Sequence, residues 1–348
     1  MGSTNNRRMI GTAAKRVQTM DARIALAFLV LGGSLVDARA QPPVELDIAA
    51  NAIGFSKQTQ MLYATVPSSA GLPHGNHLIE ISPTDGLITD SVFVGSEPTA
   101  LAISADSPVA YVGLEGAAKA RRVDLAPLTA GIQFGLGNSP YGYGPLYATA
   151  IAVMPGASGT VAISRHAKDV SPDYQGVAIF DDGVIRPTMV TPFYGPTFLG
   201  FGTQSTTLFG CGYSLTAYKL AVDASGVSIA TSVQNLAAGP IVVDGDTIYA
   251  GNGAVVNGTQ MQLLGTYDSS GPVVVDDTRQ TVSFVNGTAI QVFDRDTFVP
   301  LFSVNIDAAT GYPLSAAGCG SGCIGVVFDS GQIFVISDIE HVFADGFE

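Results

Sequence analysis

Groups of short apolar segments recur along this chain, and each group begins close to a proline residue. The successive prolines are 47, 51, 44, 32 and 41 residues apart. They are Pro98, Pro145, Pro196, Pro240, Pro272 and Pro313. One further unit fits before Pro98, which makes seven units in the chain. Because self-similarity at such an interval is the signature of repeat architectures, we expect the units to stack into one continuous core.

Residues 95–137 show what a single unit contains. It has four short runs that are apolar or alternate with small residues: "ALAIS", "VAYVGL", "ARRVDL" and "AGIQFGLG". Runs of this length between turn residues predict β-strands, and helical periodicity is absent after residue 40. We therefore predict an all-β fold, a seven-bladed β-propeller in which each blade is a four-stranded antiparallel sheet.

The last unit of the repeat ends after three apolar runs, so one strand is missing from it. An unassigned run, "VELDIA" at Val44–Ala49, precedes the first complete unit. We predict that this N-terminal strand completes the last blade and closes the ring. Closure of this kind protects sheet edges that would otherwise pair with other chains.

The two ends of the chain differ from the repeats. Five basic residues precede the apolar run "IALAFLVLGGSLV", which is too short to span a bilayer, and Ala38-Arg39-Ala40 follows as a small-x-small cleavage pattern. We predict a signal peptide at residues 1–40, with Met1 or Met20 as the start, one propeller domain at 41–341, and a C-terminal tail at 342–348. The protein is then secreted, to the periplasm or beyond the cell, with no membrane span after signal cleavage.

Charge limits the partners of the secreted chain. Removal of residues 1–40 takes away six of the 16 basic residues and two of the 29 acidic residues, which leaves a net charge of −17. Nucleic acids and anionic membranes are bound through clustered Lys and Arg, so this acidic protein is expected to bind neither. A protein, a glycan and a small molecule remain open as partners, and we expect a monomer.

Cysteine is sparse, with three residues in the whole chain. In an exported protein the spacing of Cys319 and Cys323 permits a small disulfide loop, and two free thiols are the alternative. Cys211 stands alone in an apolar run and is expected to be buried. Three cysteines without paired spacing do not suggest a zinc site.

Four pieces of the sequence resemble the YVTN-type β-propeller repeat of secreted bacterial proteins. They are Ser82–Gly86, Val94–Pro98, Ala102–Asp106 and Tyr111–Val112, all within residues 78–136, where the match is strongest. Asp85 takes the usual Thr position, and Ser107-Pro108 replaces an expected Gly. The C-terminal "VFADGFE" also resembles the tails of exported proteins from some gammaproteobacteria.

The resemblance implies a wide range of functions. The superfamily includes lactonases, the large subunits of amine dehydrogenases, surface-layer proteins and many binding scaffolds, so the fold does not decide between them. No catalytic motif of the family can be placed on this sequence. The chain also lacks a G-x-S-x-G elbow and an S-x-x-K motif.

Three long segments interrupt the otherwise short turns: Pro67–Asn76, Gly137–Tyr147 and Arg165–Gln175. In a propeller the turn between the second and third strands lies on the same face as the links between blades. The three segments should therefore lie side by side, on blades one to three, and extra loop length often serves binding. The candidate ligand-binding residues are His74, His77, Tyr141, Tyr143, Arg165, His166, Lys168 and Tyr174.

Some of these residues are also types that bind metal ions. His74, His77 and His166 could together hold a metal, but Pro73 and Gly75 make the backbone irregular, so we expect no metal and no cofactor. The paired aspartates of the turns suggest calcium by composition alone. Capping of their own turns is the favoured role, because no complete calcium loop is present.

These observations favour a secreted binding or scaffold protein that recognises its ligand through the long loops of blades one to three. The alternative is a lactonase-like hydrolase, or an enzyme similar to a dehydrogenase subunit, with its site at the mouth of the central channel. Such an enzyme requires convergent ionisable side chains or a cofactor at the channel mouth.

Overall fold

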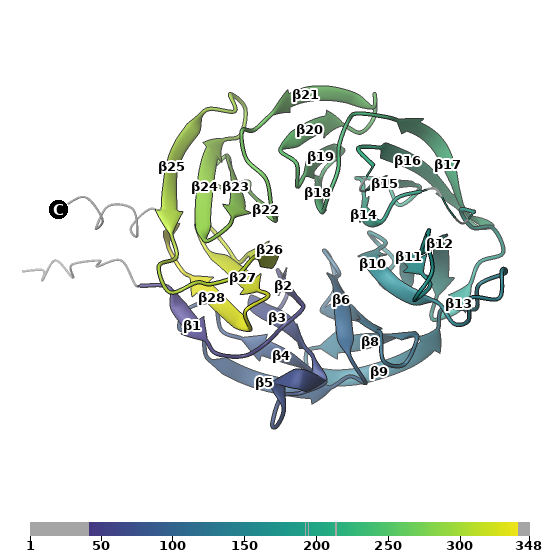
Figure 1. The fold of residues 1–348 in the computed structure, drawn as a ribbon, viewed down its shortest axis with the longest axis horizontal. Helices are drawn as coiled ribbons and strands as arrows, with labels where there is room; N and C mark the ends of the chain where they lie inside the picture. Colours follow the sequence, from purple (N-terminus) through teal and green to yellow (C-terminus); the bar gives the residue numbers. More distant parts are fainter. Residues whose placement is uncertain (1–41, 192, 194, 213, 340–348) are drawn as a thin grey trace, which may run out of the picture. The chain divides into compact units, whose positions relative to one another are not determined.

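The computed structural model describes residues 42–191, 193, 195–212 and 214–339, which belong to one compact unit of the chain. The predicted signal peptide at 1–40 and the predicted tail at 342–348 lie outside the described residues. Seven four-stranded antiparallel sheets stand around a centre like the blades of a propeller (Figure 1). The predicted all-β, seven-bladed architecture is confirmed.

In blades one to six the strands follow chain order from the channel outward, and in the last blade β26 to β28 do so before the N-terminal strand is added outside them. The strands of blades one to three are β2 (Ala52–Ser56), β3 (Met61–Val66), β4 (His77–Ile81), β5 (Ile88–Phe93), β6 (Pro98–Ile103), β7 (Val109–Leu114), β8 (Lys119–Leu125), β9 (Leu128–Gly135), β10 (Tyr147–Val153), β11 (Thr160–His166), β12 (Tyr174–Asp181) and β13 (Val184–Ile185). A single 3-10 turn, η1 (Ser68–Ala70), follows β3.

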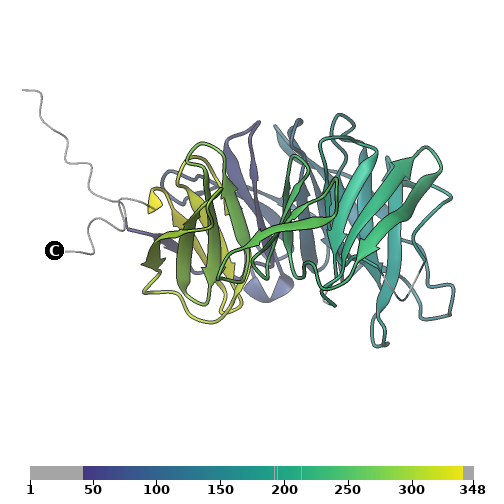
Figure 2. The same ribbon diagram turned by 90° about the horizontal axis from the view of Figure 1, so that it is seen from above.

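The remaining blades follow the same plan. Their strands are β14 (Phe198–Phe201), β15 (Thr207–Cys211), β16 (Ala217–Asp223), β17 (Gly226–Val233), β18 (Ile241–Asp244), β19 (Thr247–Ala250), β20 (Ala254–Asn257), β21 (Gln262–Thr266), β22 (Val273–Asp276), β23 (Thr281–Asn286), β24 (Ala289–Asp294), β25 (Pro300–Asn305), β26 (Pro313–Gly318), β27 (Ile324–Phe328) and β28 (Gln332–Ile336). Seen edge-on, the blades form a slab with turns projecting from both faces (Figure 2).

The ring closes through a strand from the N-terminal side of the chain. β1 (Val44–Leu46) pairs antiparallel with β28, and Glu45 lies opposite Phe334. The last sheet therefore has the order β1-β28-β27-β26. The strand covers only the first half of the predicted segment Val44–Ala49, but it occupies the predicted outermost position of the last blade.

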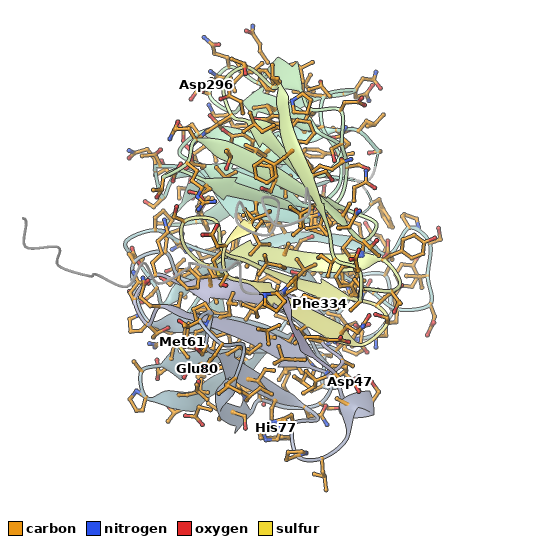
Figure 3. The ribbon with its side chains drawn as sticks, turned by 90° about the vertical axis from the view of Figure 1, so that its left-hand side faces the viewer. Asp47, Met61, His77, Glu80, Asp296 and Phe334 are labelled. Carbon is orange, nitrogen blue, oxygen red and sulfur yellow. A yellow bond between two sulfur atoms is a disulfide. The ribbon has the colours of Figure 1, made fainter. Side chains whose placement is uncertain are left out.

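Both faces of the sheets are buried against neighbouring blades. On β28, Ile333 and Val335 pack with Leu62 of the first blade, whereas Phe334 and Ile336 pack with residues of the sixth blade. Phe334, labelled in Figure 3, is only 1% exposed. Because neighbouring side chains on a strand point to opposite faces, a strand that is buried on both sides reads as a continuous apolar run.

Ring closure can be tested on the two neighbouring residues of β1 that differ in burial. We expect Leu46→Ala to lower the free energy of unfolding by about 1 to 2 kcal/mol, because its half-buried side chain packs against the core between blades seven and one. Glu45→Ala on the exposed side of the same strand serves as the control. Equal effects of the two variants in urea unfolding would show that β1 contributes no packing to the ring.

Aspartates stabilise the turns, and two of them also join one blade to the next. Asp106 accepts a hydrogen bond from the backbone N–H of Gly156 at 2.5 Å, and Asp276 accepts one from Gly322 at 2.8 Å. Asp294 caps its own turn by accepting a bond from the N–H of Thr297 at 2.8 Å. Bonds to the ionised form keep the pKa values of Asp106 and Asp294 below their usual range.

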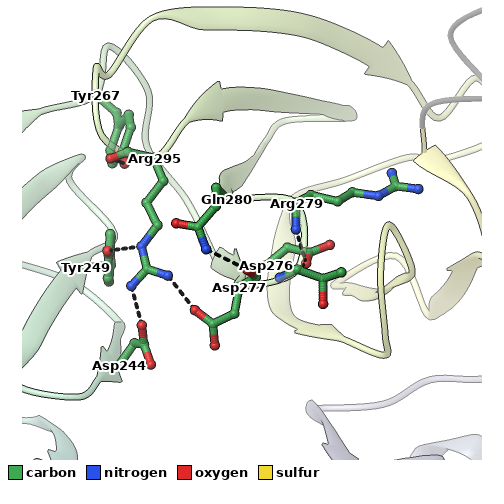
Figure 4. A network of polar contacts seen from close by, with 9 residues as sticks. Asp244, Tyr249, Tyr267, Asp276, Asp277, Arg279, Gln280 and Arg295 are labelled. Atoms are coloured by element: carbon green, nitrogen blue, oxygen red, sulfur yellow. Dashed lines mark hydrogen bonds and ion pairs between the residues drawn. The ribbon is translucent and has the colours of Figure 1, made fainter.

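Arg295 is the centre of a polar network between blades five and six (Figure 4). Its guanidinium forms ion pairs with Asp244, the last residue of β18, and with Asp277 in the turn after β22. Its Nε also donates a hydrogen bond to the Tyr249 hydroxyl at 2.8 Å. Three partners on two blades hold this side chain, which is 16% exposed. We therefore expect the network to stabilise the fold more than an ordinary surface ion pair does.

The contribution of this network can be compared with that of a simple pair. We expect Arg295→Ala to lower the free energy of unfolding by about 1 to 3 kcal/mol, because it leaves two aspartates without a partner. Arg122→Ala is the matched control. Among the described residues, Arg122 forms an ion pair only with Asp124 on the same strand, and both side chains are substantially exposed. Denaturant titrations of both variants measure the difference, and similar losses would argue against an inter-blade role for Arg295.

A disulfide links Cys319, which follows β26, to Cys323, which precedes β27, with their Cα atoms 4.9 Å apart. The backbone N–H of Cys319 also donates to the carbonyl of Cys323 at 2.9 Å. The remaining cysteine, Cys211, is buried with a free thiol. Burial raises the pKa of that thiol to about 12, so Cys211 is not a reactive thiolate.

Candidate binding site at the mouth of the central channel

The innermost strands of all seven blades surround a cavity of about 560 Å³. Many short side chains line it, where the innermost strands converge, together with larger apolar ones such as Leu101 and Phe198. The short ones include Ala52, Ala100, Ala148, Ala150, Val242 and Ala316. The cavity is therefore apolar along most of its wall, and the few charged groups at its edge are conspicuous.

Two charged groups and a histidine meet at one mouth of this channel. Glu115 lies in the turn after β7, His166 ends β11, and Lys168 follows it. The Lys168 ammonium is 3.1 Å from Glu115 Oε1, and His166 Nε2 is 3.8 Å from the same oxygen. Glu115 and His166 also line the channel cavity. Glu115 and Lys168 lie in the turns between the second and third strands of blades two and three, and His166 is the strand residue that precedes the second of these turns.

The start of β10 adds an aromatic ring and a hydroxyl to the cluster. The Lys168 ammonium lies 4.5 Å from the centre of the Tyr147 ring, close enough for a cation–π contact. The ring of His166 is 5.6 Å from that of Tyr147. His166 Nδ1 is 2.9 Å from the hydroxyl of Thr149. We call Glu115, Tyr147, Thr149, His166 and Lys168 the channel-mouth cluster.

Burial and charge set the protonation of the histidine. Desolvation lowers the pKa of His166 below its usual value, although the carboxylates of Glu115 and Asp173 act in the opposite direction. The imidazole is therefore neutral near pH 7. The cluster then presents one carboxylate, one ammonium and one neutral imidazole. The side chains of Glu115 and Lys168 are 32% and 41% exposed, so both remain accessible to a ligand.

Backbone contacts hold the turn that carries Glu115. The N–H of Glu115 donates to the carbonyl of Glu97 at 2.8 Å, and that of Gly116 donates to the carbonyl of Ser96 at 3.1 Å. Position 116 requires glycine, because an added Cβ would lie 2.2 Å from the Ser96 hydroxyl oxygen. Glu97 also accepts a bond from the N–H of Ser68 at 3.4 Å, so the loop Pro67–Asn76 is connected to this turn through one residue.

The eight candidate residues from the sequence do not form a single site. His166 and Lys168 belong to the channel-mouth cluster. His77 bonds through Nδ1 to the carbonyl of Gly75 at 2.8 Å and packs edge-on against Phe93. His74 lines a separate groove of about 440 Å³ between β1 and the first blade.

The other four candidates belong to blade three and to the link that precedes it. Tyr141 and Tyr143 are 52% and 42% exposed on that link, with their ring centres 6.1 Å apart. Arg165 and Tyr174 are buried, with 3% and 9% exposure. Loop length pointed to two residues of the channel-mouth cluster, but it did not distinguish exposed residues from buried ones.

Sequence reasoning missed Glu115, Tyr147 and Thr149. Glu115 stands in a short turn, where loop length carries no signal. Its charge, in the otherwise small and apolar segment "VGLEGAA", was the only available indication. Within the described residues, no group of three or more His, Cys, Asp or Glu side chains could hold a metal ion. None of the described helices is long and apolar enough to cross a membrane.

Comparison with known proteins supports the fold. No family model matches the sequence, and no curated protein matches it. A chain of hydrazine synthase from Kuenenia stuttgartiensis is similar in structure, with a TM-score of 0.61 and 15% identity, over 84% of this chain and 97% of that one. It is one of 1520 solved chains that match, so the fold alone does not select a function.

The protein is therefore a seven-bladed β-propeller, a class that commonly serves as a binding or scaffold module. Two features of this propeller bear on binding: the polar cluster at one mouth of the channel and the cavity that the innermost strands surround. The resemblance to the YVTN-type repeat stays a prediction.

The lowered pKa of His166 predicts a pH dependence of stability. The folded state favours the neutral imidazole, so stability is complete above the ordinary histidine pKa of about 6.5 and falls as the pH drops toward the lower, folded-state value. We expect the loss of unfolding free energy between pH 7.5 and 5.5 to be smaller in His166→Gln than in the unaltered protein. Urea titrations at these pH values measure it, and parallel pH profiles would contradict the assignment.

Proposed function

We propose that this protein is a secreted binding protein that takes a small molecule with one polar face at the channel-mouth cluster. The observation that carries the proposal is the position of Glu115, His166 and Lys168 at the edge of a cavity of about 560 Å³. Small-molecule sites commonly have volumes of about 300 to 1,000 Å³, with apolar walls and a few polar groups. Of the partner classes that the sequence leaves open, this geometry favours a small molecule over a protein or a glycan.

The chemistry of the cluster limits the ligand further. Glu115 and Lys168 satisfy each other in the free protein, so a ligand gains most if it supplies a partner to both of them. The neutral imidazole of His166 adds a site that can donate or accept a hydrogen bond, depending on its tautomer. We therefore expect a ligand with a hydrogen-bond donor and acceptor on one face and an apolar body that enters the channel.

Secretion is part of the proposal. It rests on the predicted signal peptide at residues 1–40. The disulfide between Cys319 and Cys323 supports it, because such bonds persist mainly in oxidising compartments.

A thermal-shift screen of small molecules with one polar face, followed by calorimetric titration of each hit, tests the proposal. We expect Glu115→Gln and Lys168→Ala each to weaken a true ligand by about tenfold or more, which corresponds to about 1.4 kcal/mol. Lys57→Ala is the matched control, because this exposed lysine lies in the turn between β2 and β3, at the opposite strand ends. Hits that bind all three variants equally would place the binding site elsewhere.

A further inference from the structure

Arg165 is a buried cation without a carboxylate partner. It lies near the end of β11 and is 3% exposed. Among the described residues, no Asp or Glu forms an ion pair with it. Arginine stays charged at physiological pH, and buried charges in proteins are normally paired. The described residues therefore supply no carboxylate to balance this charge.

The guanidinium uses its hydrogen-bond donors unevenly. Nη1 donates to the carbonyl of Leu136 at 3.2 Å. Nη2 has only a long bond of 3.4 Å to the carbonyl of Gln175 and a contact of 3.1 Å with the sulfur of Met189. Nε is buried and has no partner. The edge formed by Nε and Nη2 is the one that binds a carboxylate through two parallel hydrogen bonds, and it is the edge left nearly unused here.

Gln175, the neighbour of Arg165 on β12, supplies another unused donor. Its side chain is 1% exposed, and its Oε1 accepts a hydrogen bond from the Ser139 hydroxyl at 2.9 Å. Ser139 Oγ in turn accepts from the N–H of Tyr141 at 3.2 Å, so the Ser139 proton is directed to Gln175 and fixes the orientation of the amide. Gln175 Nε2 is buried without a partner, as is the hydroxyl of the adjacent Tyr174.

We propose that Arg165 and Gln175 bind the carboxylate group of a small organic acid. The Nε and Nη2 atoms of Arg165 would donate to the two carboxylate oxygens, and Gln175 Nε2 would supply a further hydrogen bond. The bound anion neutralises the buried cation and satisfies its unused donors. Burial lowers the pKa of Arg165 to about 10, which is the direction that an uncompensated buried charge produces.

This site is separate from the channel-mouth cluster. Arg165 contacts the link between blades two and three through Leu136, whereas His166 faces the channel cavity. Residues 137–147 fold over Arg165 as a small hairpin, with a bridge between Asn138 and Pro145. A Cβ added at Gly137 would lie 3.9 Å from Arg165 Nη1, so the start of the hairpin lies against the guanidinium. Entry of an acid at this buried position would require residues 137–147 to move aside.

Sodium formate and sodium acetate are suitable probes, because they carry the carboxylate with almost nothing else. We expect each to raise the melting temperature of the protein saturably, by about 3 °C or more at a hundredfold excess over Kd, relative to sodium chloride of equal ionic strength. Arg165→Met should abolish this effect. Glu115→Gln, in the channel-mouth cluster, should retain it, so failure of this proposal is distinguishable from failure of the proposed function.

A second measurement covers the case in which Arg165→Met does not fold. Gln175→Leu removes only a neutral donor, and we expect it to weaken formate binding several-fold in titrations followed by the ¹³C signal of labelled formate. Saturable formate signals that acetate displaces would support the site. No saturable effect beyond that of chloride, or the same effect in Arg165→Met, would overturn it and assign the unused donors to internal water.

Discussion

Each blade of this protein is a sheet with two apolar faces, and both faces must be kept from water. On β28, alternate side chains pack against the first and the sixth blades, so no sheet is stable without a neighbour on each side. A row of sheets would leave two faces exposed, whereas a ring leaves none. The pairing of β1 with β28 completes the last blade and is therefore the contact on which the closed arrangement depends.

The ring also creates the site. Closing seven sheets brings their innermost strands together around one channel, and the turns between second and third strands gather near its mouth. Glu115 and Lys168 are 53 residues apart in the chain, yet an ion pair joins them. The charged groups thus lie beside an apolar cavity, where their electrostatic interactions are stronger than in water.

The sequence pattern was enough to predict much of the architecture, but only part of the candidate site. Apolar runs and turn residues are local signals, and the missing fourth strand of the last unit pointed to Val44–Ala49 for closure, of which Val44–Leu46 forms the strand. Loop length directed attention to His166 and Lys168. It failed for Glu115, which stands in a short turn, and it grouped His74 with them, although His74 lines a separate groove beside β1. Loop length does not report how far from the channel a residue lies.

The sequence by itself determined the number of blades, the strands within them and the strong negative charge, because hydrophobic period, turn chemistry and charge are properties of residue type and spacing. Only the tertiary structure decided which polar groups meet and which are buried. Arg165 looks like an exposed loop cation in the sequence, but it is 3% exposed in the fold. Burial depends on what the neighbouring blade places over a residue, and that contact is long-range in the chain.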